Sequence, residues 1–226
     1  MNFSANYIFD FFLPRFCPGC NKKLSSNEEP VCKECLDSIL LADENLLRRE
    51  FNRKFSSTKI INGFYSKYIF ETDKTLQNVI HSLKYNKQFR IGTFLGNILA
   101  KELISENWSI DMILSVPIHH LKKTERGYNQ SDFIVKGISK VLKIPYSTNS
   151  IKRTRYTETQ TALKLQERAK NVKNAFKVRN SKKVMNKNIL LVDDVITTGA
   201  TTLECAKALV NSGAISVYAC SVGIAE

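Results

Sequence analysis

The chain has 226 residues, a length that suggests one full domain with a small additional module. Its hydrophobic content of 43% is enough for a core, which excludes disorder of the whole chain. The formal net charge of +13 favours a polyanionic partner such as nucleic acid, a phosphorylated ligand or an anionic membrane surface. No run reaches the roughly 18 apolar residues that would span a bilayer.

The N-terminal segment is rich in Phe, Ile and Leu but lacks the pattern of a signal peptide. Asp10 interrupts its apolar run, no basic stretch precedes that run, and Pro14 and Arg15 stand where small residues would mark a cleavage site. We therefore predict an amphipathic helix over 6–13 that packs on the body of the protein, and we expect a cytoplasmic protein.

Four cysteines form two C-x2-C pairs separated by a short loop. Two such turns present four thiolates that can complete a tetrahedron around Zn²⁺, and four protein ligands make the metal structural. Gly19 would let the backbone of the first pair curl toward a sulfur. Reduced thiols or disulfides are the alternative, although a reducing compartment disfavours disulfides. The predicted metal ligands are Cys17, Cys20, Cys32 and Cys35.

The remaining cysteines, Cys205 and Cys220, lie in apolar surroundings and are expected in the core. After the N-terminal helix and zinc module of residues 1–41, the segment 42–59 is predicted as a linker or surface helix. A second domain is expected over 60–226.

Predicted strands alternate with predicted helices along this second domain. Strands are expected at 60–69, 112–116, 189–192 and 215–222, and helices at 74–83, 94–103, 131–141, 163–175 and 202–212. The basic segment 150–155 is expected to be a loop, and Gly213 should cap the last helix. This alternation predicts an α/β fold with a mostly parallel sheet flanked by helices.

Two adjacent carboxylates, Asp193 and Asp194, follow the clearest buried strand. A turn of hydroxyl residues comes next, Gly199 permits close approach of an anion, and a helix is expected to begin near residue 201. Ligands bind at the carboxyl ends of strands in such sheets. The carboxylates can accept hydrogen bonds from sugar hydroxyls or hold Mg²⁺. The pattern predicts a site for a ribose 5-phosphate.

The stretch from Val192 to Thr201, VDDVITTGAT, resembles the phosphoribosyl pyrophosphate loop of type I phosphoribosyltransferases. The resemblance implies that fold, and it implies that Asp193 and Asp194 are catalytic and contact the ribose hydroxyls, with Mg²⁺ bound alongside the ligand. The residues that would cradle the 5-phosphate are Val195, Thr197, Thr198, Gly199, Ala200 and Thr201.

Further segments, at 115–120, 125–130 and 155–160 and at Glu167-Arg168, resemble the ComF family in the same order along the chain. That family is associated with natural DNA uptake and carries an N-terminal zinc ribbon. The chain departs from the family pattern at His119 and His120, where a leucine is more usual, and at Tyr128, where phenylalanine is usual.

The resemblance places a pyrophosphate-binding loop over 116–127. A solvated basic loop is the alternative, and we expect His119 and His120 to be surface histidines rather than ligands. The candidate pyrophosphate-binding residues are Lys84, Lys122, Lys123, Arg126 and Gly127.

The segment 152–183 carries eleven basic residues against two acidic ones, so much of the positive charge lies beside the expected site. Within it, 155–160 resembles a loop that closes over the sugar. Such a surface suits single-stranded DNA or a clamp for pyrophosphate. Aromatic stacking partners are sparse in this segment, where Tyr156 and Phe176 are present, and we do not expect sequence-specific binding. The candidate DNA-binding residues are Lys152, Arg153, Arg155, Arg168 and Lys170.

Three functional hypotheses follow from these observations. The first is an accessory protein of DNA uptake that binds phosphoribosyl pyrophosphate with Mg²⁺ and single-stranded DNA, with a helicase-like ATPase as the partner that the resemblance implies. The second is a biosynthetic phosphoribosyltransferase acting on a base or an amine. The third is a sensor of the ligand without turnover, and the sequence leaves open whether catalysis occurs.

Overall fold

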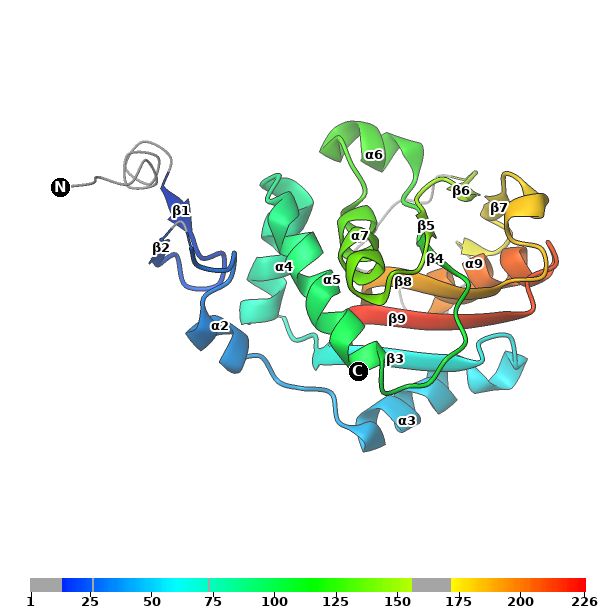
Figure 1. Cartoon of the computed structure of the whole chain (residues 1–226), viewed down its shortest axis with the longest axis horizontal. Coiled ribbons are helices and arrows are strands. Elements are labelled where there is room, and N and C mark those ends of the chain that lie inside the picture. Colours follow the sequence, from blue (N-terminus) through cyan, green and yellow to red (C-terminus); the bar gives the residue numbers. More distant parts are fainter. Residues whose placement is uncertain (1–13, 26, 73, 156–171) are drawn as a thin grey trace.

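The computed structural model describes residues 14–25, 27–72, 74–155 and 172–226 (Figure 1). The helix predicted over 6–13 lies outside these residues, as does most of the one predicted over 163–175. Within them, no helix is both long and apolar enough to cross a membrane.

A parallel sheet of five strands, in the order β3-β9-β8-β4-β5, forms the centre of the molecule. The strands are β3 (Gly63–Ile69), β4 (Met112–Ser115), β5 (Tyr146–Ser147), β8 (Asn188–Ile196) and β9 (Ser216–Ile224). The first four residues of β8 after Asn188 are fully buried, as expected for a strand covered on both faces. The α/β fold class predicted from the sequence is confirmed.

Helices cover both faces of this sheet (Figure 1). One face packs on α4 (Thr75–Tyr85), α5 (Phe89–Leu103) and α7 (Gln130–Leu142). The other packs on α3 (Glu44–Lys54) and α9 (Ala200–Val210). Successive side chains of β8 point to opposite faces of the sheet. Leu190 and Val192 belong to the hydrophobic cluster on the first face, and Ile189 and Leu191 belong to the cluster on the second. The predicted surface helix within 42–59 is therefore α3, followed by the short helix η1 (Ser56–Thr58).

The cysteine-containing module is built from β1 (Arg15–Phe16), β2 (Lys23–Leu24) and α2 (Lys33–Asp37). It shares a continuous hydrophobic cluster with α4, to which it contributes Val31 and Ile39 among others. At the start of α4, Thr75 lies 3.1 Å from the hydroxyl of Ser38, and a Cβ placed on Gly19 would come within 2.9 Å of its methyl group. The module therefore rests on the first turn of α4.

The segment that leaves this module adds to the sheet. Leu41 forms an antiparallel bridge with Tyr68, and the amide of Ile69 donates to the carbonyl of Leu40. The otherwise open edge of β3 is thereby covered by the chain that leads into α3.

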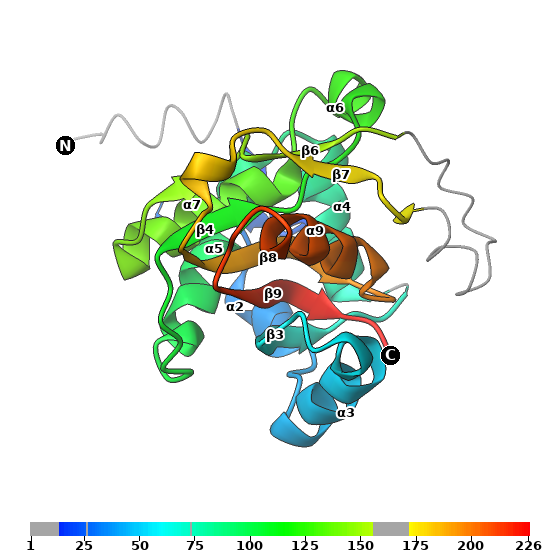
Figure 2. The ribbon, with the colours of Figure 1, turned by 90° about the vertical axis from the view of Figure 1, so that its right-hand side faces the viewer.

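The loop predicted over 150–155 is instead a strand, and this prediction was wrong. β6 (Ile151–Arg153) pairs with β7 (Phe176–Val178) in an antiparallel hairpin. Figure 2 shows the two strands side by side close to α9. Ile151 and Phe176 are buried, while Lys152 and Lys177 between the buried positions are exposed. The strand periodicity is present, but the many basic residues concealed it.

The segment 116–127, predicted as a loop, is helical over most of its length. α6 (His120–Arg126) is capped at its N-terminus by His119, whose ring nitrogen Nδ1 accepts from the amide of Leu121 at 3.3 Å. Gly127, with φ of +82°, ends it in the left-handed conformation. A histidine and a glycine as capping residues gave only a weak signal for a helix in the sequence. The prediction of a loop over 116–127 was therefore wrong for most of this segment. The remaining short helix is η2 (Ser181–Lys183).

Glycines allow α5 and α7 to touch through their backbones. A Cβ on Gly96 would lie 2.1 Å from the carbonyl oxygen of Ile134, and one on Gly137 would lie 2.3 Å from that of Thr93. Since backbone cannot yield as a flexible side chain can, these two helices approach closely only because both positions lack a side chain.

We predict that Gly96→Ala lowers the free energy of unfolding by about 2–3 kcal/mol, because the added methyl overpacks the helix crossing. Helix propensity alone predicts the opposite sign, a gain of up to about 1 kcal/mol. Urea denaturation followed by circular dichroism measures the difference. The exposed change Lys101→Ala on the same helix serves as the control and should stay within about 0.5 kcal/mol of the wild type. A stabilised Gly96→Ala variant would contradict the packing described.

Candidate functional site

The candidate site lies where β8 meets α9. β8 continues to Ile196, so both aspartates lie within the strand, where Asp193 and Val195 pair with Ser221 and Gly223 of β9. The prediction ended this strand at Val192 because its apolar run stops there. Polar residues extend the strand because β8 is central and its backbone has a partner on β9.

The turn after β8 offers its backbone to an anion. Gly199 has φ of +74° and ψ of −7°, and α9 begins directly after it at Ala200, one or two residues before the predicted start. Within the described part of the chain, the amides of Thr197, Thr198 and Gly199 donate no hydrogen bond. Consecutive unbonded amides at the positive end of a helix dipole form a phosphate-binding concavity.

Phe55 supports this turn from behind. A Cβ on Gly199 would lie 2.8 Å from the ring of Phe55, which is itself fully buried. Glycine is thus required at this position both for the left-handed conformation and for the contact. The turn is held in place by the residue that follows α3.

The two aspartates have different surroundings. Asp194 is 4% exposed, and its Oδ2 lies 2.6 Å from Nζ of Lys84 on α4. Asp193 is partly exposed, and its Oδ1 accepts from the hydroxyl of Ser131 at 3.1 Å and from the amide of Asp194 at 2.9 Å. We expected both acids to face a ligand, but Asp194 is paired with a lysine that we had placed at the pyrophosphate.

These surroundings separate the two carboxyl groups electrostatically. Burial, followed by the charge of Asp194, raises the pKa of Asp193 well above its usual range. Burial also opposes ionisation of Asp194, but the charge and hydrogen bond of Lys84 outweigh it and hold the pKa of Asp194 below its usual value. The strand therefore carries one firmly ionised carboxylate and a neighbour that takes up a proton readily.

Positive side chains gather next to the aspartates. Burial lowers the pKa of Lys122, and the charges of Arg126, Arg153 and Lys84 lower it further, which places these four cations near one another. Arg126 also donates to the hydroxyl of Tyr85 at 2.9 Å and lies over its ring. Of the predicted pyrophosphate residues, the structure thus brings together Lys84, Lys122 and Arg126. Gly127 ends α6, and Lys123 lines a separate pocket.

The two histidines differ from the prediction. His120 is exposed as expected, but His119 is only 3% exposed, so its assignment to the surface was wrong. Burial, followed by the charges of His120, Arg153 and Lys122, lowers the pKa of His119. A neutral ring is consistent with its role as the acceptor that caps α6.

The predicted DNA-binding residues that the structure describes lie on or beside the β6–β7 hairpin. Lys152 is exposed, Arg153 stacks 5.6 Å above the ring of Phe176, and Arg155 donates to the carbonyl of Lys173 at 3.1 Å. Arg168 and Lys170 lie outside the described residues, as does the segment 156–160 of the predicted closing loop.

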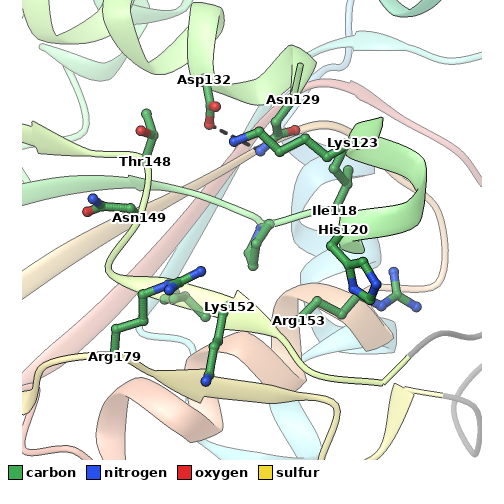
Figure 3. Close-up of a pocket in the computed structure, with 12 residues that line it drawn as sticks. Ile118, His120, Lys123, Asn129, Asp132, Thr148, Asn149, Lys152, Arg153 and Arg179 are labelled. Atoms are coloured by element: carbon green, nitrogen blue, oxygen red, sulfur yellow. Dashed lines mark hydrogen bonds between the residues drawn. The ribbon is translucent and has the colours of Figure 1, made fainter. Parts of the chain in front are cut away.

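Sequence reasoning missed a pocket of about 130 Å³ between this hairpin and the start of α7 (Figure 3). Lys123 and Lys152 line it, as does Arg179, which was counted among the basic residues of the segment but given no role. Its polar residues come from four separate segments, and two of these overlap the segments 115–120 and 125–130 that resemble the ComF family. No single motif predicts that they meet in one pocket.

The four cysteines predicted as metal ligands lie together. Their sulfur atoms are all within 4.8 Å of one another, three of the four residues are buried, and none of the described cysteines forms a disulfide. The amide of Cys32 donates to the sulfur of Cys17 at 3.4 Å. A Cβ on Gly19 would approach the sulfur of Cys35 to 2.6 Å, so this glycine provides space for the cluster. This donor set can hold a metal ion.

Exchanging each aspartate for asparagine should change stability in opposite directions. Because the folded pKa of Asp193 is raised, its ionisation costs stability as pH rises above about 4, and Asp193→Asn should increase the free energy of unfolding at pH 7. Because the folded pKa of Asp194 is lowered, its ionised form stabilises the fold above about pH 4, and Asp194→Asn should decrease that free energy.

Urea denaturation at pH 7 and at pH 4 measures both effects. The effect of Asp193→Asn should nearly vanish at pH 4, whereas that of Asp194→Asn should largely persist, because the folded Asp194 stays ionised to lower pH. Asparagine keeps the acceptor for Ser131, so the comparison isolates charge. Two changes of the same sign at pH 7 would contradict the electrostatic difference between the carboxyl groups.

No family model matches this chain. Competence protein F of Haemophilus influenzae is 32% identical over 202 residues, which are 85% of this chain and 83% of that protein. DNA utilization protein YhgH of Escherichia coli K12 is 34% identical over 147 residues, which are 63% of this chain and 64% of that protein. The chain thus spans slightly less than two thirds of the length of its YhgH relatives.

Among solved structures, the chain is similar to a glutamine phosphoribosylpyrophosphate amidotransferase of B. subtilis, with a TM-score of 0.39 and 22% identity over 57% of this chain and 25% of that one. It is also similar to a hypoxanthine phosphoribosyltransferase of Staphylococcus aureus, with a TM-score of 0.36 and 12% identity over 60% of this chain and 73% of that one. By its identity to Competence protein F along most of both chains, the protein belongs to the ComF family.

Proposed function

We propose that this protein acts in DNA uptake, binding phosphoribosyl pyrophosphate with Mg²⁺ at the carboxyl edge of the sheet and single-stranded DNA along the β6–β7 hairpin. The turn with three unbonded amides beside a pair of carboxylates is the observation that carries this proposal. The amides suit the 5-phosphate, and the carboxylates suit the hydroxyls of the ribose.

The charges around the aspartates support a pyrophosphate on the same ligand. Lys84 pairs with Asp194, and the charges of Lys84 and Arg126 both act on Lys122, so the three cations form one group that begins at the acid pair. Mg²⁺, when bound with the ligand, would supply further neutralisation of the pyrophosphate, and the partly exposed Asp193 is the acid best placed to contact it. Lys84 holds Asp194 ionised, so that this acid is ready to accept hydrogen bonds from sugar hydroxyls.

Displacement of pyrophosphate from the anomeric carbon is the reaction that such an arrangement would support. The basic residues around Lys122 would then stabilise the leaving group as its charge develops. The protein would work in the cytoplasm with a helicase-like ATPase of the competence system, a partnership that rests on family membership alone.

The hairpin supports the part of the proposal that concerns DNA. Exposed Lys152, Arg155 and Lys177 surround its strands. Contacts of this kind bind the phosphate backbone without reading sequence. The four-cysteine cluster holds a structural zinc ion in this proposal, because four thiolates in tetrahedral reach match the preference of Zn²⁺.

Calorimetric titration with phosphoribosyl pyrophosphate and Mg²⁺ tests the ligand site. We expect Asp193→Asn to weaken binding at least tenfold, because the variant removes a charge that faces the hydroxyls and the metal. Asp111→Asn makes the same chemical change at the other end of the sheet, just before β4, and should leave affinity within twofold. Equal affinity of the wild type and Asp193→Asn would remove this acid from the site.

Metal analysis of the purified protein tests the cysteine cluster. The wild type should contain one zinc ion per chain, and Cys17→Ser should lose it and unfold at lower temperature, since metal binding contributes directly to folding. Cys205→Ser, which changes a buried cysteine far from the cluster, should keep its zinc. A full zinc content in Cys17→Ser would refute the ligand set.

A further inference from the structure

A pocket lies between the β6–β7 hairpin and the start of α7 (Figure 3). It adjoins the site at the aspartates, because Arg153 lines the pocket and also interacts electrostatically with Asp193. The residues that line it lie in four segments: 117–123 after β4, 129–132 at the start of α7, 148–153 before and in β6, and Arg179 after β7. None of the residues that line it belongs to the segment 193–201, and Lys84 does not line it either.

The pocket has two chemically different sides. Figure 3 shows Lys152, Arg153 and Arg179 along the hairpin side. The opposite side presents neutral and acidic polar groups, which are those of Asn129, Asp132, Thr148 and Asn149. Lys123 reaches this second side from α6. One end of a ligand would therefore meet cations, and the other would meet hydrogen-bonding groups.

The pocket has one acidic residue, Asp132, against four cationic ones, which are Lys123, Lys152, Arg153 and Arg179. Oδ1 of Asp132 accepts from the hydroxyl of Ser115 at 2.6 Å and from the side-chain amide of Asn129 at 3.1 Å, so this oxygen already has protein partners. Among the residues that the structure describes, Lys123, Lys152 and Arg179 take part in no ion pair.

Size restricts what can enter. A volume of about 130 Å³ is enough for a group of the size of a phosphate. An anion that accepts from lysine and arginine on one side and from amide and hydroxyl groups on the other matches both the size and the charge of this space.

We propose that this pocket binds a single phosphate group, separately from the ligand at the aspartates. The group would belong to the backbone of a single-stranded polynucleotide lying along the hairpin, or to a small free phosphate. In its polynucleotide form the inference rests on the proposed DNA binding, because Lys152 belongs to both the pocket and the exposed face of β6.

Substitution at Thr148 tests the pocket with a matched pair of variants. Thr148 is exposed and lines the pocket, so Thr148→Asp adds a negative charge without disturbing the core, and Thr148→Asn adds a side chain of the same size without the charge. Equal melting temperatures of the two variants would confirm that both fold.

Three probes are titrated into the full chain: inorganic phosphate followed by NMR, a labelled 20-nucleotide oligothymidylate followed by fluorescence anisotropy at low salt, and phosphoribosyl pyrophosphate with Mg²⁺. Thr148→Asp should weaken binding of inorganic phosphate about tenfold and of the oligonucleotide at least threefold, because like charges repel across a few ångströms. Thr148→Asn should stay within twofold of the wild type for all three, and oligonucleotide binding by the wild type should fall steeply with added salt.

The outcomes separate the sources and the proposals. Weaker binding of both phosphate and oligonucleotide supports a polynucleotide phosphate, whereas weaker binding of phosphate alone supports a small free ligand. Unchanged phosphate binding overturns the inference, and so does an equal loss for phosphoribosyl pyrophosphate, which would make the pocket part of the first site. If the wild type binds neither the oligonucleotide nor phosphoribosyl pyrophosphate, the proposed function is wrong. The titration with inorganic phosphate then still tests whether the pocket binds a phosphate group.

Discussion

The placement of two carboxyl groups side by side on a central strand is the constraint on which the rest of the site depends. Two neighbouring buried charges of the same sign are unstable, and the fold relieves them with the ion pair from Lys84 to Asp194. Asp193 is left with weaker support from Ser131 and retains a partly exposed side chain. The weaker support of Asp193 lowers the stability of the fold at this edge and leaves one carboxyl group accessible.

The features that the sequence predicts well are those in which one short segment contains the whole signal. The buried run at 189–192 identified β8, the C-x2-C pairs identified the cysteine cluster, and the glycine after the two threonines identified the turn between β8 and α9. Each depends on local chemistry, such as apolar content, ligand spacing or backbone freedom. The family resemblance rested on the same local motifs and is confirmed by the comparison with Competence protein F.

What the sequence could not provide depends on partners distant along the chain. β6 needs its pairing with β7 to become a strand, and the ion pair of Asp194 needs α4 to bring Lys84 across the sheet. His119 is buried in the folded chain, although its neighbour His120 is exposed and the two are alike in sequence. The pocket below the hairpin is assembled from four segments and exists only in the folded chain.

Helix α4 connects the cysteine module with the aspartates of β8, two regions that lie far apart in the sequence. Its first residue, Thr75, touches the cysteine module through Ser38, and one residue before its end Lys84 holds Asp194. Eleven residues of helix span about 16 Å as one stiff rod. The position of Lys84 therefore depends on the same rigid element that carries the cysteine module at its other end.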